Sequence, residues 1–281
     1  MSAPAGIGDP PNYFSRTFAL LRLSLIQLVR PPSHPRRAEA ARKLLRQLLL
    51  LGFILGAVSI ALMFELDVAE IGLMPARGTA SLWPVRILTD FGKDAYLLLV
   101  LAGTLFAVAL IAPRLRGSSR SRLLGFGTRL QYLFFAVLLP VLAGEMVKWI
   151  VGRGRPFVGG KANAFNFEHF AGTEAYASFP SSHAVTAFAL AFAVAALWPR
   201  ARVAMSVYAV LIGLSRLVLL AHHPSDVAAG ALIGVAGAMC VRYWFAARWL
   251  GFTIGRDGAI MPLARPPLVR LKRVAREASA P

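Results

Sequence analysis

The sequence is poor in charged residues, in acidic residues especially, and in cysteine. Only 16% of its 281 residues are charged, 13 are Asp or Glu against 31 Lys or Arg, and one is Cys. Because 57% of the side chains are hydrophobic and the mean hydropathy is +0.61, the composition excludes an ordinary soluble globule and indicates an integral membrane protein. A lone Cys240 also excludes a disulfide framework and a thiolate metal cluster.

The formal net charge of +18 suggests a polyanionic partner. The basic residues are dispersed among hydrophobic segments, however, and no nucleic-acid-binding motif accompanies them. We therefore expect no nucleic acid partner and expect contact with anionic membrane lipids instead. The sequence leaves the oligomeric state open.

Residues 14–30 have the pattern of an amphipathic helix. Apolar side chains recur at helical spacing, Arg22 interrupts any continuous hydrophobic stretch, and no small-residue cleavage site follows. We expect an interfacial helix on the cytoplasmic leaflet, ended by the prolines that begin at Pro31, and not a signal peptide.

Six apolar runs follow, several of them near the short end of the roughly 20 residues that a bilayer core requires. They cover residues 44–64, 95–112, 130–150, 183–198, 203–220 and 227–249. The predicted fold is all-α, a polytopic membrane protein with six transmembrane helices in a bundle, preceded by the N-terminal amphipathic helix. The predicted division is a cytoplasmic N-terminal segment (1–43), a transmembrane domain (44–250) and a basic cytoplasmic tail (251–281).

Lysines and arginines are distributed unevenly about these six runs. Of the 31 basic residues, 23 fall on one side of the predicted spans. By the positive-inside rule that side is cytoplasmic, and it includes both termini. The expected location is the inner membrane of a bacterium, with the opposite side facing the periplasm.

Three polar clusters lie on that opposite side. Lys148–Pro156 leaves the third span in a loop that Gly152 and Gly154 are expected to make flexible, Pro180–His183 opens the fourth span, and Ser215–Asp226 joins the fifth to the sixth. Ionisable groups next to apolar runs are rare and usually have a function. Because each cluster lies at a helix end, a bundle can bring all three together at one depth.

The residue types in these clusters suit a phosphoryl group. The cations of Lys148, Arg155 and Arg216 match phosphate oxygens. Ser181 and the backbone N–H groups at the start of the fourth helix add donors aimed at an anion. Such a cradle stabilises the charge that develops during phosphoryl transfer.

Two histidines supply the remaining chemistry, one attacking phosphorus and the other protonating the leaving oxygen. His222 precedes Asp226 by four residues, so the carboxylate can orient its ring, and His222 is the predicted nucleophile. Pro224 disfavours a continuous helix here and allows a helix start at Ser225. His183 has no such carboxylate nearby in the sequence and is the predicted general acid.

Together the three clusters resemble the three-part signature of the type-2 phosphatidic acid phosphatase superfamily, and within it the integral membrane lipid phosphate phosphatases. The matching residues are Lys148-x6-Arg155-Pro156, Pro180-Ser181-Ser182-His183 and Ser215-Arg216-x5-His222-x3-Asp226. The resemblance covers roughly residues 45–250. It implies a phosphohistidine on His222, oriented by Asp226, with His183 as acid and later base, and it implies neither a metal nor another cofactor. The residues implied to hold the phosphate are Lys148, Arg155, Ser181, Ser182 through its backbone N–H, and Arg216.

One position departs from the family pattern. The second motif usually has Gly where this chain has Ser182, and Ser is a small replacement that keeps the N–H group. We expect a modest loss of activity or a shifted substrate preference. Glu145, three residues before Lys148, is expected to pair with Lys148 or another buried cation as structural support.

The resemblance leaves the substrate open among polyprenyl diphosphate, phosphatidylglycerol phosphate, phosphatidic acid and the lipid A phosphates. Residues 157–179 mix polar and aromatic side chains and are expected to cover a head group. Two alternatives stay open: a lipid phosphotransferase that uses the same intermediate, and a non-catalytic membrane protein that binds lipid phosphate. A vanadate-dependent oxidase of the same superfamily is disfavoured by the predicted spans.

Overall fold

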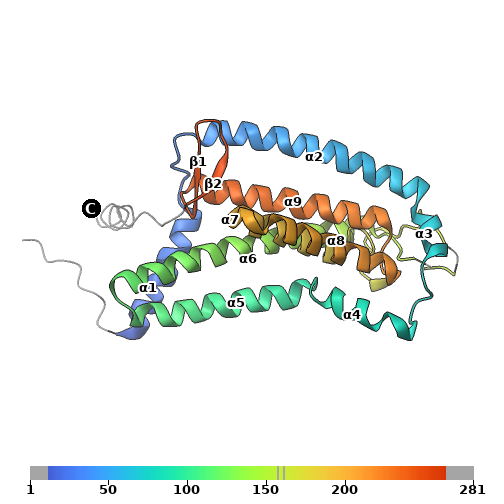
Figure 1. The fold of residues 1–281 in the computed structure, drawn as a ribbon, viewed down its shortest axis with the longest axis horizontal. Helices are drawn as coiled ribbons and strands as arrows, with labels where there is room; N and C mark the ends of the chain where they lie inside the picture. The colour runs from blue at the N-terminus through green and yellow to red at the C-terminus, as the bar shows by residue number, and fades with distance from the viewer. Residues whose placement is uncertain (1–11, 157, 161, 264–281) are drawn as a thin grey trace, which may run out of the picture.

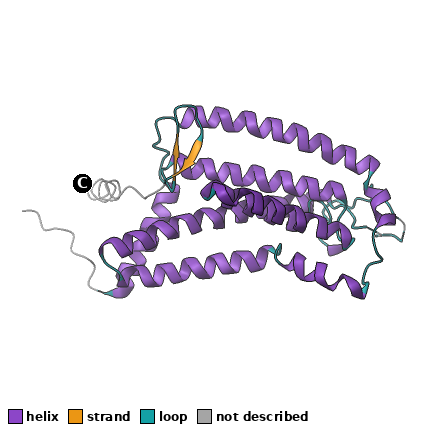
Figure 2. Cartoon of the chain, viewed as in Figure 1, coloured by secondary structure: helices purple, strands orange, loops and turns teal. Residues whose placement is uncertain are grey.

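The computed structural model describes residues 12–156, 158–160 and 162–263. These residues form a bundle of helices, of which α2, α5, α6 and α9 run along the long axis of the molecule (Figures 1 and 2). The α-helices are α1 (Tyr13–Val29), α2 (Arg37–Glu65), α3 (Asp67–Leu73), α4 (Trp83–Asp90), α5 (Asp94–Ile111), α6 (Gly117–Val151), α7 (Ser182–Leu197), α8 (Arg202–Val218) and α9 (Pro224–Ala247). Two strands follow, β1 (Phe252–Ile254) and β2 (Ile260–Pro262).

Within the part of the chain that the structure describes, five helical segments are long and apolar enough to cross a membrane. They are Arg37–Glu65, Ala80–Arg114, Gly117–Val151, Pro199–Val218 and Pro224–Ala247. The predicted fourth span corresponds to α7, which is apolar but has only 16 residues, fewer than the roughly 20 that span a bilayer core. The structure thus shows five long apolar helices and a shorter sixth, α7, which packs against α6, α8 and α9 in the centre of the bundle.

The prediction of an all-α chain needs one correction. Within the segment predicted as a basic tail, β1 and β2 pair antiparallel, with Phe252 opposite Pro262. Two short apolar runs flank a turn in which Gly258 has a positive φ of 73°, and this arrangement favours a hairpin over a helix. Phe252 is fully buried, and its ring centroid lies 4.7 Å from that of Tyr132 in α6. The rest of the predicted tail, from residue 264, lies outside the described residues.

The N-terminal helix α1 covers almost the range predicted for the amphipathic helix. Its residue Leu28 is buried, whereas Phe14 and Phe18 on the same helix are 82% and 70% exposed. A hydrogen bond joins this helix to the end of α5: the Tyr13 hydroxyl donates to the carbonyl oxygen of Leu110 at 2.6 Å. Contact of its exposed apolar side chains with the membrane interface stays a prediction.

Helices α7 and α9 approach each other more closely at Gly230 and Gly234 than side chains at these two positions would permit. A Cβ atom at Gly230 would lie 2.7 Å from the carbonyl oxygen of Ser181, and one at Gly234 would lie 2.4 Å from that of Val185. Small residues four apart allow this close packing of apolar helices. The N–H of Ser181 also donates to the carbonyl oxygen of Asp226 at 3.1 Å, so both helices begin at the same end of the bundle.

The start of the loop after α6 folds back against a later part of the same loop, and the flexibility expected from its glycines stays a prediction. Gly152 ends α6 in the left-handed conformation (φ 56°, ψ 49°), which glycine adopts without strain. A Cβ atom there would lie 1.7 Å from the carbonyl oxygen of Glu168, whose own N–H donates to the Gly152 carbonyl at 2.7 Å. Gly152 therefore allows the loop to fold back over the end of the bundle.

Candidate active site

The three sequence clusters meet at one end of the bundle, where α6 and α8 end and α7 and α9 begin (Figure 1). The ammonium group of Lys148 in the first cluster bonds to the hydroxyl of Ser182 in the second. The N–H of Ser181 in the second bonds to the Asp226 carbonyl in the third. The guanidinium of Arg153 in the first reaches the Asp226 carboxylate at 2.6 Å. Each pair of clusters is thus joined by a direct contact.

The three predicted phosphate-binding cations have different surroundings. Lys148 forms the expected ion pair with Glu145, which confirms that pairing. Arg216 lies in the last turn of α8 and donates from Nη1 to the hydroxyl of Thr89 in α4 at 2.8 Å. Among the described residues, Nε of Arg216 and Nε of Arg155 are buried without a hydrogen-bond partner. Donors of both guanidinium groups are therefore left for an anion.

The ring of His222 is 3% exposed, and its Nδ1 donates to the carbonyl oxygen of Ser178 at 2.7 Å. A carbonyl oxygen only accepts, so Nδ1 carries the proton and Nε2 keeps its lone pair. Burial, and after it the positive charges of Arg216 and Arg155, hold the pKa of His222 well below its usual value. The ring is therefore neutral near pH 7, as a nucleophile must be.

The structure corrects the expected contact between Asp226 and His222. The Asp226 carboxylate oxygen Oδ2 lies 3.9 Å from Nδ1 of His222, too far for a hydrogen bond. Oδ2 instead accepts from the Ser178 hydroxyl at 2.6 Å and from the N–H of His223 at 2.9 Å. The reason is that α9 begins at Pro224 with His223 as its N-cap, so His222 lies outside the helix that carries Asp226 and the two residues are not one helical turn apart. The helix start predicted at Ser225 is also wrong.

The remaining residues of the second cluster surround the start of α7. Ser181 is fully buried at the N-cap position, yet its hydroxyl makes no capping hydrogen bond. The described residues also provide no hydrogen-bond partner for that hydroxyl or for Nε2 of His183. Ser182, at the first position of α7, uses its hydroxyl to bond to both Lys148 and Glu145. Polar atoms with hydrogen-bonding capacity are thus concentrated at this helix start.

Four residues at the site were not predicted from the sequence. Arg153 and Asp67 form a buried ion pair at 2.7 Å, Ser178 holds His222, and Thr89 holds Arg216. Asp67 carried one signal, since it is an acidic residue directly after a long apolar run, where charged groups usually have a partner. The Ser178 contact carried none, because it uses a backbone atom.

Comparisons with known proteins agree with this arrangement. The model of the PAP2 superfamily matches residues 129–250. Over 182 residues the chain is 35% identical to a lipid A 1-phosphatase of Rhizobium johnstonii, covering 64% of this chain and 73% of the relative. A lipid A 1-phosphatase of Rhizobium etli is 34% identical over 182 residues, covering 64% and 77%.

A more distant relative is the bacitracin transport permease protein BcrC of Bacillus licheniformis, 27% identical over 168 residues, which cover 57% of this chain and 78% of the relative. No solved structure matches the chain. The family model covers all three clusters, and the first relative is matched over nearly three quarters of its length. The chain therefore belongs to the PAP2 superfamily.

Proposed function

We propose that the chain is a membrane lipid phosphatase in which Nε2 of His222 attacks the phosphorus of a lipid phosphate. The observation that carries the proposal is the set of direct contacts that joins the three clusters around a buried, neutral histidine. A neutral imidazole whose second nitrogen is fixed by a hydrogen bond is a competent nucleophile. The neighbouring guanidinium groups stabilise the negative charge of the phosphoryl group in the transition state.

The reaction has two steps. In the first, a bond forms between Nε2 of His222 and phosphorus, the bond from phosphorus to the lipid oxygen breaks, and His183 gives that oxygen a proton. In the second, His183 takes a proton from a water molecule, the water oxygen bonds to phosphorus, and the bond from phosphorus to Nε2 of His222 breaks, which releases inorganic phosphate. The residues that hold the phosphate in both steps are Lys148, Arg155, Arg216, the hydroxyl of Ser181 and the N–H of Ser182. No metal takes part.

The proposed substrate is the 1-phosphate of lipid A, because this is the substrate named for two relatives that are 35% and 34% identical. Such a substrate requires a site at the membrane surface. The bias of basic residues supports a periplasmic surface and cytoplasmic termini. The described part of the loop between α6 and α7 includes Phe165 and Phe170, which are 48% and 56% exposed, and these suit contact with acyl chains.

The test is phosphate release by the purified protein from lipid A, polyprenyl diphosphate, phosphatidylglycerol phosphate and phosphatidic acid in detergent. His222→Ala serves as the blank, and a parallel reaction contains EDTA. We expect wild type to release phosphate from lipid A fastest, with no acceptor added and with no effect of EDTA. The His222→Ala rate should equal that without protein.

Each alternative gives a different result. Release that needs a lipid acceptor would indicate a phosphotransferase. Equal release by wild type and His222→Ala would indicate a protein that binds lipid phosphate without turnover. A preference for another member of the panel would replace lipid A as the substrate and keep the mechanism.

A further inference from the structure

We propose that Asp67 is a positioning residue of this site, acting through Arg153 on the residues that orient His222. The proposal rests on the proposed function. Asp67 begins α3, directly after α2, and belongs to none of the three clusters or to residues 129–250, which the family model matches. It is nevertheless fully buried, and among the described residues every polar contact of its carboxylate is with the first or third cluster.

The guanidinium group of Arg153 lies at the centre of the contacts. Its Nη2 donates to Oδ2 of Asp67 at 2.7 Å, and its Nη1 donates to Oδ1 of Asp226 at 2.6 Å. Nη1 also donates to the Ser225 hydroxyl at 2.6 Å, and Nε and Nη2 donate to the carbonyl oxygen of Ala164 at 3.0 and 2.8 Å. With Arg153 1% exposed and both carboxylates fully buried, water does not compete for these bonds.

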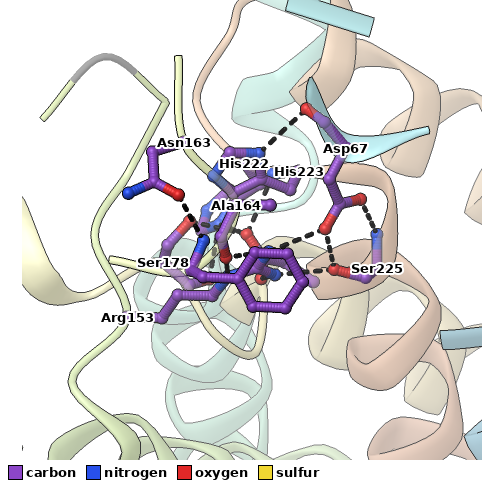
Figure 3. Close-up of polar contacts among 10 residues, drawn as sticks. Asp67, Arg153, Asn163, Ala164, Ser178, His222, His223 and Ser225 are labelled. Carbon is purple, nitrogen blue, oxygen red and sulfur yellow. Dashed lines mark hydrogen bonds and ion pairs between the residues drawn. The ribbon is translucent and has the colours of Figure 1, made fainter. Parts of the chain in front are cut away.

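Asp67 also holds the start of α9. Its Oδ1 accepts the N–H of Ser225 at 3.0 Å, and its Oδ2 accepts the Ser225 hydroxyl. Ser225 is the second residue of α9, where a carboxylate interacts favourably with the unpaired N–H groups and with the helix dipole. Figure 3 shows Asp67 beside Ser225 and His223, with the carbonyl oxygen of Asp67 3.4 Å from Nδ1 of His223.

A continuous path of hydrogen bonds leads from Asp67 to His222. Arg153 joins Asp67 to Asp226, and Oδ2 of Asp226 accepts the Ser178 hydroxyl at 2.6 Å. The backbone carbonyl of Arg153 accepts the N–H of Ser178 at 3.0 Å. Ser178 is thus held at two points, and its own carbonyl fixes Nδ1 of His222. Removing the charge of Asp67 weakens the bond that holds Nη2 of Arg153. Arg153, Asp226 and Ser178 can then move, and the ring of His222 with them.

The first experiment measures the steady-state kinetics of Asp67→Asn, which keeps the size of the side chain and removes its charge. A displacement of reacting groups by about 1 Å can lower a rate about 100-fold. We expect kcat to fall by about 10- to 100-fold, and KM to change less than about threefold, because Lys148, Arg155 and Arg216 are not altered. Glu65→Gln is the matched control, since Glu65 is exposed at the end of α2, and it should keep wild-type kinetics.

A double-mutant cycle tests the path through Arg153. If Asp67 acts through Arg153, Asp67→Asn should change kcat by less than about threefold in an Arg153→Gln background. Independent, multiplicative effects would overturn the proposal, as would an unchanged kcat in Asp67→Asn alone. If Asp67→Asn does not fold, Ser225→Ala replaces it, because Ser225 shares its hydroxyl with both Asp67 and Arg153. We then expect a loss in kcat of about three- to tenfold.

A spectroscopic measurement separates this proposal from the proposed function. In protein labelled with 15N-histidine, the ring signals of His222 are assigned by their absence from His222→Ala. Wild type should show only the tautomer protonated at Nδ1, and Asp67→Asn should show a mixture. If wild type hydrolyses no lipid phosphate, the proposed function fails while this measurement still tests the positioning role. An identical His222 tautomer in both proteins would refute that role.

Discussion

Nδ1 of His222 donates to the carbonyl oxygen of Ser178 at 2.7 Å, whereas the nearest carboxylate oxygen of Asp226 lies 3.9 Å away. Asp226 is therefore linked to the histidine through Ser178. Its carboxylate accepts a hydrogen bond from the Ser178 hydroxyl at 2.6 Å. A backbone carbonyl fixes the ring tautomer as well as a carboxylate would, but it adds no full negative charge beside the ring.

This relationship predicts that Ser178→Ala lowers kcat by about three- to tenfold. The substitution keeps the carbonyl that holds His222 and removes the hydroxyl that fixes the orientation of that carbonyl. Asp226→Asn should lower kcat further, by about 100-fold, because Asp226 also holds Arg153 and the N–H of His223. Steady-state kinetics on the best substrate measure both effects. Wild-type kcat in Ser178→Ala would instead support a direct bond between Asp226 and His222.

Ser182 gives a second prediction. Its hydroxyl bonds to Lys148 and donates to Glu145 at 2.7 Å, so Ser182→Gly frees one contact of the Lys148 ammonium and keeps the backbone N–H. We expect kcat/KM to rise about two- to fivefold for at least one lipid phosphate and the order of preference within the panel to change. Ser206→Gly, on the exposed side of α8, controls for the lower helix propensity of glycine. Unchanged kcat/KM for every lipid would contradict the prediction.

The sequence predicted the helices and the meeting of the three clusters better than it predicted the contacts that hold them together. The apolar run 95–112 corresponds to α5 and the run 183–198 to α7, each shifted by one residue. These helices were predictable because a continuous run of hydrophobic residues indicates a segment that lies in lipid or in a protein core. Lys148 and His222 were identified as candidates because their motifs have fixed internal spacing. Both kinds of signal are local in the chain.

The supporting residues leave no local signal. Asp67 and Arg153 are 86 positions apart, and nothing near either residue specifies its partner. The Ser178 contact depends on a backbone carbonyl, which every residue has. The start of α9 was also ambiguous, since Pro224 suits the first turn of a helix as well as a break before one.

Thr89 gives a third prediction, which concerns the binding of the phosphate. Thr89→Val keeps the shape of the side chain and removes the hydroxyl that accepts from Nη1 of Arg216 at 2.8 Å. A hydrogen bond to a charged group is worth about 1.5–3 kcal/mol, so we expect kcat/KM to fall about tenfold. Thr104→Val is the control, because the Thr104 hydroxyl donates to the carbonyl oxygen of Val100 in its own helix. Equal kcat/KM for the two variants would show that Thr89 does not position Arg216.

Glu70 gives a fourth prediction, on stability against pH. Its side chain is 4% exposed, and its two carboxylate oxygens have no hydrogen-bond partner among the described residues. Burial, followed by the charges of Asp67 and Asp226, raises the pKa of Glu70 from 4.5 to about 7. The folded protein therefore binds this proton more tightly than the unfolded chain does. The stability that protonated Glu70 contributes is fully present below pH 4.5 and is lost as the pH rises to about 7.

Glu70→Gln removes this loss, because the amide is neutral at every pH. Thermal unfolding in detergent should give equal Tm values for Glu70→Gln and wild type near pH 4.5. At pH 8 the Tm of the variant should be several degrees higher, with the difference developing between about pH 5 and 7. Glu65→Gln, which neutralises an exposed carboxylate five residues earlier, should show no such pH-dependent difference. A constant difference between Glu70→Gln and wild type across this range would mean that Glu70 is already ionised in the folded protein at low pH.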